Sequence, residues 1–307
     1  MKILIVASLN KGFYAPFIVE QAQALENNGH NILFFGIKGQ GVFGYLKNRS
    51  RLIRVIQQFD PQIVHAHYGL SGLLANMQRK VPVVTTFHGS DINNKSVLRF
   101  SKLAMFFSAY TIFVSQRNIA IAAPKKHYQL LPCGIDSTNF QLFDKQEARA
   151  KLQLLPSRKY VLFAGSFSNR VKNPELAEKA IALLNNVELI ELKGYSRVEV
   201  NYLMHAVDAA LMTSHTEGSP QFIKEVMACG CPLVSVDVGD VKEITAGVDG
   251  CYLVSRDPKE IAEKLQLAID FKERTQGRQR IMELGLSNEL VAKKLIEIYV
   301  QISDSNR

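Results

Sequence analysis

The sequence predicts an α/β protein built from two doubly wound, Rossmann-like domains. Short apolar segments of strand character alternate with amphipathic segments of helical length along the 307 residues. Charge is divided unevenly: residues 1–150 contain 17 Lys and Arg against 7 Asp and Glu, whereas residues 151–307 contain 20 against 21. These observations place a domain boundary near residue 150. We therefore expect domains at 1–150 and 151–286, followed by a helical segment at 287–307.

The expected elements of the first domain are strands at 2–8, 31–37, 61–67, 82–87 and 111–115 and helices at 17–28 and 95–109. Residues 38–45 contain three glycines and two aromatic side chains, which indicates a flexible loop. Four basic residues follow on a short helix: Lys47, Arg49, Arg51 and Arg54. This segment is a candidate for contact with an acceptor or with an anionic membrane surface, and the alternative is an ordinary solvated helix face.

The expected elements of the second domain are strands at 160–165, 187–192, 209–214 and 232–236, a hairpin or edge strand at 247–254, and helices at 144–155, 174–184, 198–206, 220–229, 258–274 and 287–303. Ser219 is a suitable N-cap and Pro220 suits the first helical position, so a helix is expected to begin there. In a strand–loop–helix–strand unit the helix N-terminus lies at the carboxyl edge of a parallel sheet, where open α/β sheets bind ligands.

Two glutamates flank the start of this helix. Glu217 lies on the loop, and Glu225 lies about 7–8 Å further along at the helical rise. Such carboxylates suit two hydroxyl-rich ends of one elongated ligand, with the amides around Gln221 facing negative charge between them. The alternative is a surface loop residue and a solvated helix residue.

A second polar loop, at residues 166–173, also lies between a strand and a helix. Arg170 offers a planar fork and Lys172 a mobile point charge, and both can hold a diphosphate.

Several classes of protein are disfavoured. The dinucleotide fingerprint G-x-G-x-x-G is missing after the first strand. The four cysteines form no C-x-x-C pair and predict thiols in a reducing cytoplasm. Asp237 and Asp240 have no His or Cys partner and form no D-x-D, so no metal or other cofactor is expected. The sequence contains no nucleic-acid module and no apolar run of membrane-spanning length.

The stretch from Glu217 to Glu225 resembles the E-x7-E signature of family 4 retaining glycosyltransferases, which have the GT-B fold. D-P-x-I-V-H-A-H, T-x-H-G-x-D and L-x-G-Y-S-R are similar to further motifs of that family. The resemblance implies two domains facing across a cleft, with the last helix crossing back to the first domain. It also implies transfer of a sugar from a nucleoside diphosphate to a carbohydrate or lipid-linked acceptor, without a metal and in polysaccharide or glycolipid synthesis.

The resemblance further implies roles for single residues. His88 would lie over the donor sugar and its pyrophosphate, Gly12 would lie near donor and acceptor, and Gly194 and Tyr195 would lie near the base. The family has an Arg where this chain has Ser166, and we expect Arg170 to replace that charge. His65 and His67 are interpreted as structural or acceptor-side.

Two alternatives remain open. The chain could be a nucleotide-sugar epimerase of the same fold. Because of Ser166, it could instead be a catalytically silent protein that binds a nucleotide sugar. In either case the sequence predicts a cytoplasmic protein, with contact to an anionic membrane through the basic first half as a further expectation.

Overall fold

The computed structural model describes residues 1–136 and 138–305. They form two compact units, one comprising Met1–Gly134 with the C-terminal segment from Asn288, and the other comprising Ile135–Ser287. The first boundary between the two units therefore lies between Gly134 and Ile135, earlier in the chain than the boundary expected near residue 150. The segment between these positions is bonded to the second unit, since the Arg149 guanidinium donates to the Ala206 carbonyl and to the Asp208 carboxylate, each at 2.8 Å.

The first unit contains a six-stranded sheet in which all neighbours are parallel. In spatial order the strands are β2 (Asn31–Ile37), β1 (Lys2–Ser8), β3 (Ile63–His67), β4 (Val83–Phe87), β5 (Tyr110–Phe113) and β6 (Tyr128–Leu130). The central strands are buried on both faces, which is typical of a parallel sheet covered by helices on each side.

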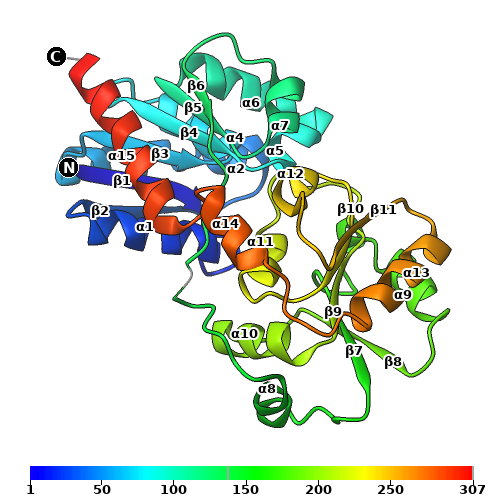
Figure 1. Cartoon of the computed structure of the whole chain (residues 1–307). Helices are drawn as coiled ribbons and strands as arrows, with labels where there is room; N and C mark the ends of the chain where they lie inside the picture. Colours follow the sequence, from blue (N-terminus) through cyan, green and yellow to red (C-terminus); the bar gives the residue numbers. More distant parts are fainter. Residues whose placement is uncertain (137, 306–307) are drawn as a thin grey trace. The chain divides into compact units, whose positions relative to one another are not determined.

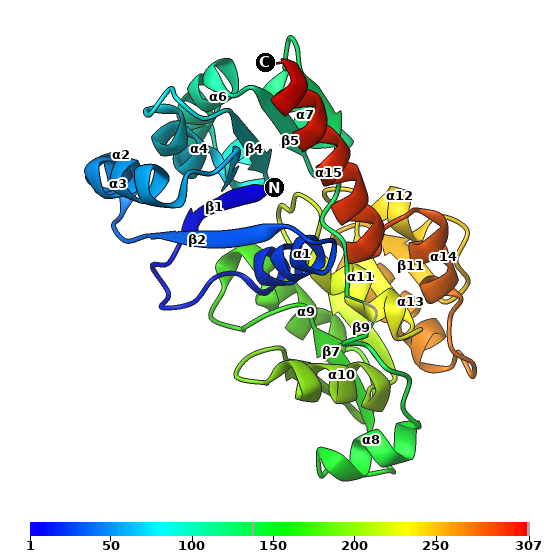
Figure 2. The same ribbon diagram turned by 90° about the vertical axis from the view of Figure 1, so that its left-hand side faces the viewer.

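Successive side chains of β1 alternate between two hydrophobic cores. Ile3 and Ile5 pack with α1 (Pro16–Asn27) and α15 (Asn288–Ser305), whereas Leu4 and Val6 pack with α3 (Arg49–Phe59) and α4 (Gly69–Asn76). Helices α1 and α15 lie side by side, as both views of the ribbon show (Figures 1 and 2). The remaining helices of this unit are α2 (Gly41–Leu46), α5 (Ser90–Asn93), α6 (Lys95–Phe107) and α7 (Gln116–Ala122).

The second unit contains a five-stranded parallel sheet. Its spatial order is β11 (Cys251–Val254), β10 (Leu233–Val236), β9 (Ala209–Met212), β7 (Lys159–Phe163) and β8 (Val187–Glu191). Its helices are α8 (Lys145–Lys151), the 3-10 turn η1 (Arg170–Lys172), α9 (Pro174–Ile181), α10 (Arg197–Ala206), α11 (Gln221–Ala228), α12 (Val241–Thr245), α13 (Pro258–Ile269) and α14 (Gly277–Glu283). One continuous core fills this unit.

Some local expectations were wrong. The glycine-rich stretch after β2 contains the helix α2 rather than only a loop. Of the two alternatives for 247–254, the hairpin is wrong and the edge strand is confirmed, because β11 pairs in parallel with β10 at the edge of the sheet. The spacing of Leu98, Leu103 and Phe106 predicts one apolar face for the 95–109 helix, but on α6 Leu103 and Phe106 are exposed. The helix packs through Leu98 and the buried residues Ser101 and Ala104 instead.

The strand order of each sheet reverses direction at one point. In the second unit β7 and β9 are neighbours. The chain after β7 continues to β8 on one side of this pair, and the chain after β9 continues to β10 on the other side, so the two loops leave neighbouring carboxyl ends in opposite directions. In the first unit β2 and β3 flank β1 in the same way. Such switch points are where doubly wound sheets bind ligands.

Candidate functional site

The switch point of the second unit brings two sequence-predicted residues into contact. Lys172, at the end of η1 after β7, donates from Nζ to Oε1 of Glu217 on the loop after β9, at 2.7 Å. Their side chains are 21% and 17% exposed, so the pair is partly shielded from water and still reachable by a ligand. The site therefore presents one cation and one carboxylate on adjacent loops.

Hydrogen bonds to backbone carbonyl groups hold these two loops together. The Thr213 hydroxyl donates to the carbonyls of Lys172 and Asn173, both at 2.9 Å, and the His215 amide donates to the Val171 carbonyl at 2.9 Å. The guanidinium of Arg256 donates to the Ser214 carbonyl from a third segment. The position of Lys172 relative to Glu217 is thus fixed by the fold and not by the ion pair alone.

Gly165 leaves space for the stem of Lys172. A Cβ at Gly165 would lie 3.0 Å from Cγ of Lys172, closer than ordinary van der Waals contact. The neighbouring Ser166 forms a hydroxyl–hydroxyl bond with Ser168 at 2.9 Å and brings no charge to the loop. Arg170 is exposed at the start of η1, two residues before Lys172, so its proposed replacement of the missing charge stays a prediction.

Helix α11 begins one residue later than expected. Pro220 has an extended backbone (φ −70°, ψ 121°) and is itself the N-cap, so Ser219 is not the cap and its side chain makes no capping bond. Side-chain atoms Oγ of Ser214 and Nε2 of Gln221 are buried and have no hydrogen-bond partner within residues 1–136 and 138–305. Buried polar atoms are almost always bonded, so these two atoms, one on the loop after β9 and one at the start of α11, are exceptions at the candidate site.

Glu225, on α11, is paired with a residue that the sequence reasoning did not assign to the site. Nη1 of Arg197, at the start of α10, donates to Oε1 of Glu225 at 2.6 Å, and the same guanidinium lies over the Phe140 ring. Gly194 and Tyr195 precede Arg197 on the β8–α10 loop, and Tyr195 is exposed. The sequence offered one indication that Arg197 belongs to the site: it is a cationic residue at the start of a helix, directly after the loop expected to lie near the nucleotide base.

The loop after β10 packs against the backbone of the loop that carries Glu217. Gly239 has φ +63°, and a Cβ there would lie 2.3 Å from the Gly218 carbonyl oxygen, so the two backbones touch. The next residue, Asp240, is buried, and that burial raises its pKa to about 6 against the opposing effect of Lys224. Lys224 is fully buried on α11. Two buried ionisable residues, Lys224 and Asp240, therefore lie on the helix and the loop that adjoin the candidate site.

In the first unit, His88 follows β4 and is held by its own loop. The buried carboxylate of Asp91 accepts from the backbone amides of His88 and Gly89, both at 3.0 Å, and from the amide of Gly69 at 2.9 Å. Burial raises the pKa of Asp91 to about 6, although these hydrogen bonds act in the opposite direction. Asp91 thus ties the loop after β4 to the start of α4.

Aromatic rings surround the imidazole of His88. The ring centroids of Tyr68 and Phe17 lie 4.5 and 5.0 Å from it, and the ring of His67 stacks on it. Gly12 lies on the exposed loop after β1 with φ +84°. From the sequence, His67 was interpreted as structural or acceptor-side, and no contact with His88 was predicted. The two come together because β3 and β4 are neighbours, with His67 in register with Thr86.

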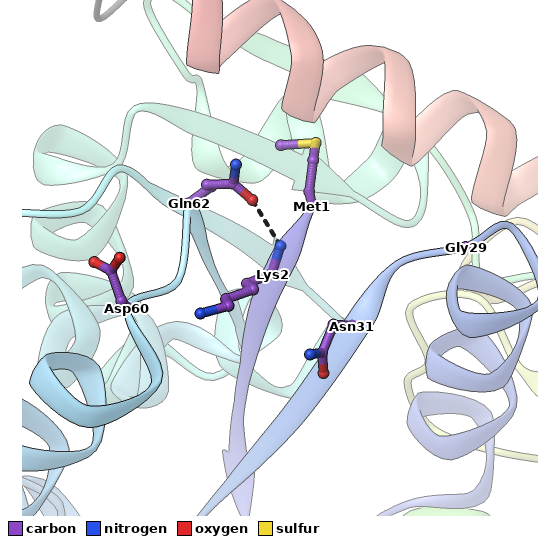
Figure 3. Close-up of a pocket in the computed structure, with 6 residues that line it drawn as sticks. All are labelled: Met1, Lys2, Gly29, Asn31, Asp60 and Gln62. Carbon is purple, nitrogen blue, oxygen red and sulfur yellow. Dashed lines mark hydrogen bonds between the residues drawn. The ribbon is translucent and has the colours of Figure 1, made fainter.

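A shallow depression lies at the opposite edge of the first unit's sheet (Figure 3). It is lined by Met1, Lys2, Gly29, Asn31, Asp60 and Gln62, and the Lys2 amide donates to Oε1 of Gln62 at 2.7 Å. These residues cluster at the amino ends of β1 and β2, away from the carboxyl ends that carry His67 and His88. The depression is therefore separate from the histidine cluster.

The described residues contain neither a cluster of metal ligands nor a membrane-spanning helix. No group of three His, Cys, Asp or Glu side chains within 1–136 and 138–305 is placed to hold a metal ion. Over the same residues, no helix has the length and apolar character needed to cross a bilayer.

Comparisons with known proteins identify the family. Residues 20–139 match the model described as Glycosyltransferase Family 4, and residues 151–270 match the model described as Glycosyl transferases group 1. The chain belongs to glycosyltransferase family 4. As a member of this family it has the two doubly wound parallel sheets of the GT-B fold.

Curated relatives of this family 4 glycosyltransferase are distant. The putative teichuronic acid biosynthesis glycosyltransferase TuaC of Bacillus subtilis is 23% identical in an alignment of 227 residues that covers 64% of this chain and 58% of TuaC. The D-inositol 3-phosphate glycosyltransferase of Mycobacterium marinum is 25% identical in an alignment of 246 residues that covers 64% of this chain and 53% of the relative. The chain thus spans a little over half the length of these relatives.

Solved structures share the fold at low identity. Sucrose-phosphate synthase from Thermosynechococcus elongatus superimposes with a TM-score of 0.87 at 15% identity, covering 99% of this chain and 100% of that one. The Anabaena protein HepE in complex with UDP gives a TM-score of 0.76 at 16% identity, covering 98% and 100%.

Proposed function

We propose that this chain transfers a sugar from a nucleoside diphosphate sugar to an acceptor hydroxyl, with retention of anomeric configuration and without a metal ion. The observation that carries the proposal is the Lys172–Glu217 pair at the switch point of the second unit. The Lys172 ammonium suits the diphosphate of a donor, and the adjacent Glu217 carboxylate suits the hydroxyl groups of the sugar attached to it.

The proposed roles follow the chemistry of each group. Lys172 and Arg170, with the amides at the start of α11, would carry the charge that develops on the leaving diphosphate. Glu217 would accept hydrogen bonds from sugar hydroxyls. Glu225 would accept from the ribose, with Arg197 holding its carboxylate in place. The buried, unbonded polar atoms of Ser214 and Gln221 support a ligand here.

The comparisons support the donor class. HepE has been solved with UDP and with UDP-glucose, and a starch synthase from Arabidopsis thaliana with ADP, all on this fold. TuaC is named for teichuronic acid biosynthesis and other relatives for D-inositol 3-phosphate. A carbohydrate or phosphorylated acceptor in polysaccharide or glycolipid synthesis is the corresponding proposal for this chain.

His88 and Gly12 of the first unit complete the proposed set. His88 is proposed to contact the donor sugar and its phosphate, and Gly12 to leave room for donor and acceptor. Gly194 and Tyr195 are proposed to lie near the base.

One observation favours a second candidate, a catalytically silent nucleotide-sugar-binding protein. Ser166 is engaged with Ser168 and supplies no cation where the family has one. Whether the chain turns over its donor decides between the two.

The test combines binding with turnover. UDP, GDP and ADP are titrated calorimetrically with and without EDTA, using wild type and Glu225→Ala. We expect one nucleotide to bind at micromolar affinity, to be unaffected by EDTA, and to lose at least tenfold in the variant (about 1.4 kcal/mol). Release of the nucleotide from its sugar donor only when an acceptor is added would establish transfer. Binding without turnover under all acceptors would establish the silent protein, and no binding would refute both.

We further propose that the first unit contacts an anionic membrane through two joined segments, the loop after β1 and the loop after β2 that leads into α2. Phe43 on α2 is 83% exposed and Phe13 on the loop after β1 is 62% exposed. The Asn10 side chain joins the two loops, donating to the Gly39 carbonyl at 2.7 Å and accepting from the Gly39 amide at 2.8 Å. Exposed lysines flank both aromatic rings in sequence: Lys11, Lys38 and Lys47.

Vesicle sedimentation tests this surface. Wild type should bind phosphatidylglycerol vesicles more strongly than phosphatidylcholine vesicles, and binding should weaken with added salt. Phe13→Ala with Phe43→Ala should reduce binding several-fold. Phe106→Ala removes a similarly exposed ring from α6 and is the matched control. Equal loss in the control would assign the effect to general hydrophobicity and refute the proposed surface.

A further inference from the structure

Three histidine rings form a stack at the carboxyl ends of β3 and β4. The centroids of His65 and His67 are 4.5 Å apart with an interplanar angle of 27°, and those of His67 and His88 are 5.2 Å apart with an angle of 23°. His65 and His67 are fully buried. His67 is therefore enclosed between a buried ring and the ring proposed to contact the donor.

The hydrogen bonds of His65 account for its presence without a role in binding. Its Nδ1 lies 2.6 Å from the Tyr299 hydroxyl on α15, and its Nε2 lies 2.8 Å from the Thr86 hydroxyl on β4. Burial lowers the pKa of His65 to about 3, so the ring is neutral. Both of its nitrogens are satisfied by residues of the core.

His67 is bonded differently. Its Nδ1 lies 3.0 Å from Nε2 of His88, whereas its Nε2 is buried and has no hydrogen-bond partner among residues 1–136 and 138–305. Burial, with smaller contributions from His65 and His88, places the pKa of His67 well below its usual value, so this ring is also neutral and has one N–H. The position of that proton decides the tautomer of its neighbour.

Only one tautomer of His67 avoids a buried, unpaired donor. A proton on Nε2 would have no protein acceptor, and unpaired buried N–H groups are rarer in proteins than under-used acceptors. A proton on Nδ1 is instead donated to His88, and only an acceptor lone pair on Nε2 of His67 is then left unused. In that arrangement Nε2 of His88 accepts the bond and cannot have its own proton.

We propose that His67 is a positioning residue that fixes His88 in the tautomer protonated on Nδ1. The imidazole of His88 then directs its N–H toward the side where Sγ of Cys133 lies 3.6 Å from Nδ1, and its Nε2 lone pair is held by His67. A fixed tautomer means that the N–H on Nδ1 is the one polar ring group of His88 that His67 leaves available. The link to the donor sugar rests on the function proposed above, whereas the tautomer itself does not.

Nitrogen-15 NMR of histidine-labelled full-length protein reads the tautomer directly, with His88→Gln used to assign the signals. In wild type we expect the protonated nitrogen of neutral His88 to be Nδ1. In His67→Leu, which keeps an apolar side chain in the stack, we expect His88 to become a mixture of tautomers. In His67→Asn we expect the wild-type signature to return, because the amide nitrogen of an Asn side chain stands where Nδ1 of His67 was and can donate to His88.

His65→Asn is the control, since it perturbs the same stack without removing a bond to His88. It should lower the melting temperature and leave the His88 tautomer unchanged. A wild-type His88 protonated on Nε2, or an unchanged signature in His67→Leu, would overturn the inference. The readout does not depend on turnover. The expected tautomers in a protein that binds no donor would therefore count against the proposed function and still support the role of His67.

Discussion

Replacing Lys172 by alanine tests the candidate site most directly. In the structure its ammonium is 2.7 Å from Oε1 of Glu217. If it also binds the diphosphate of the donor, a charge-assisted hydrogen bond worth about 1.5–3 kcal/mol is lost, which is roughly a 10- to 150-fold rise in Kd. Two oxygens that share one ammonium lie within about 5.5 Å of each other, so removal of the ammonium leaves the diphosphate exposed to repulsion by the Glu217 carboxylate.

This repulsion makes the double variant informative. Lys172→Ala with Glu217→Ala should bind the nucleoside diphosphate more tightly than Lys172→Ala alone, by about tenfold, because removal of the carboxylate relieves the repulsion. Isothermal calorimetry at two salt concentrations measures all four proteins of the cycle. Lys179→Ala removes an exposed cation from α9 in the same unit and is the control for net charge.

Two results would refute the reasoning. Lys172→Ala could bind within twofold of wild type, which would remove the diphosphate from this position. The double variant could bind more weakly than Lys172→Ala, which would mean that Glu217 itself contributes more to nucleotide binding than the repulsion costs.

Three further predictions concern the second unit. Asp208→Ala should lower the free energy of unfolding by about 3–5 kcal/mol in urea titrations, because the buried Asp208 carboxylate accepts from Arg149 and from the Tyr160 amide, both at 2.8 Å, and its loss leaves the Arg149 cation uncompensated. Burial raises the folded-state pKa of Asp240 to about 6, so stability from its protonation is present at low pH and is lost as pH rises through 6. Between pH 7.5 and 5, wild type should therefore gain about 1 kcal/mol relative to Asp240→Asn in unfolding experiments at each pH. Gly165→Ala should weaken nucleotide binding in calorimetry, since its Cβ displaces the stem of the lysine beside it, but by less than the loss of that lysine.

The sequence predicted the strands better than the helices. Residues 2–8 and 31–37 are strands with the expected bounds, because short apolar runs between turn residues allow few other structures. Helix α14 was not predicted, since its seven residues lack an apolar face of their own. It is stabilised by distant partners, for example Nε of Arg278, which donates to the Ala228 carbonyl at 2.9 Å.

The candidate site residues that can be named from the sequence are those that follow local rules. Lys172 and Glu217 could be named because each lies on a polar loop directly after a buried strand. The pairing of Arg197 with Glu225 could not, because 28 residues separate them and nothing in the sequence says which carboxylate an arginine reaches. The contact of His67 with His88 likewise depends on the lateral order of β3 and β4, which local sequence does not specify.

The chain passes between the two compact units at two positions, and the geometry of these positions determines how the units could be separated or exchanged. Ile135 and Ser287, the first and last residues of the second unit, pair as a parallel bridge, and the Ile135 amide donates to the Leu286 carbonyl at 2.8 Å. On the other side, a Cβ at Gly134 would lie 2.8 Å from Cα of Asn288. The second unit is thus an insertion whose ends meet, and a short linker could close either unit on itself. Residues 135–287 could therefore be exchanged between relatives as one piece, and such an exchange would transfer the proposed donor-binding residues of this unit without changes to the rest of the chain.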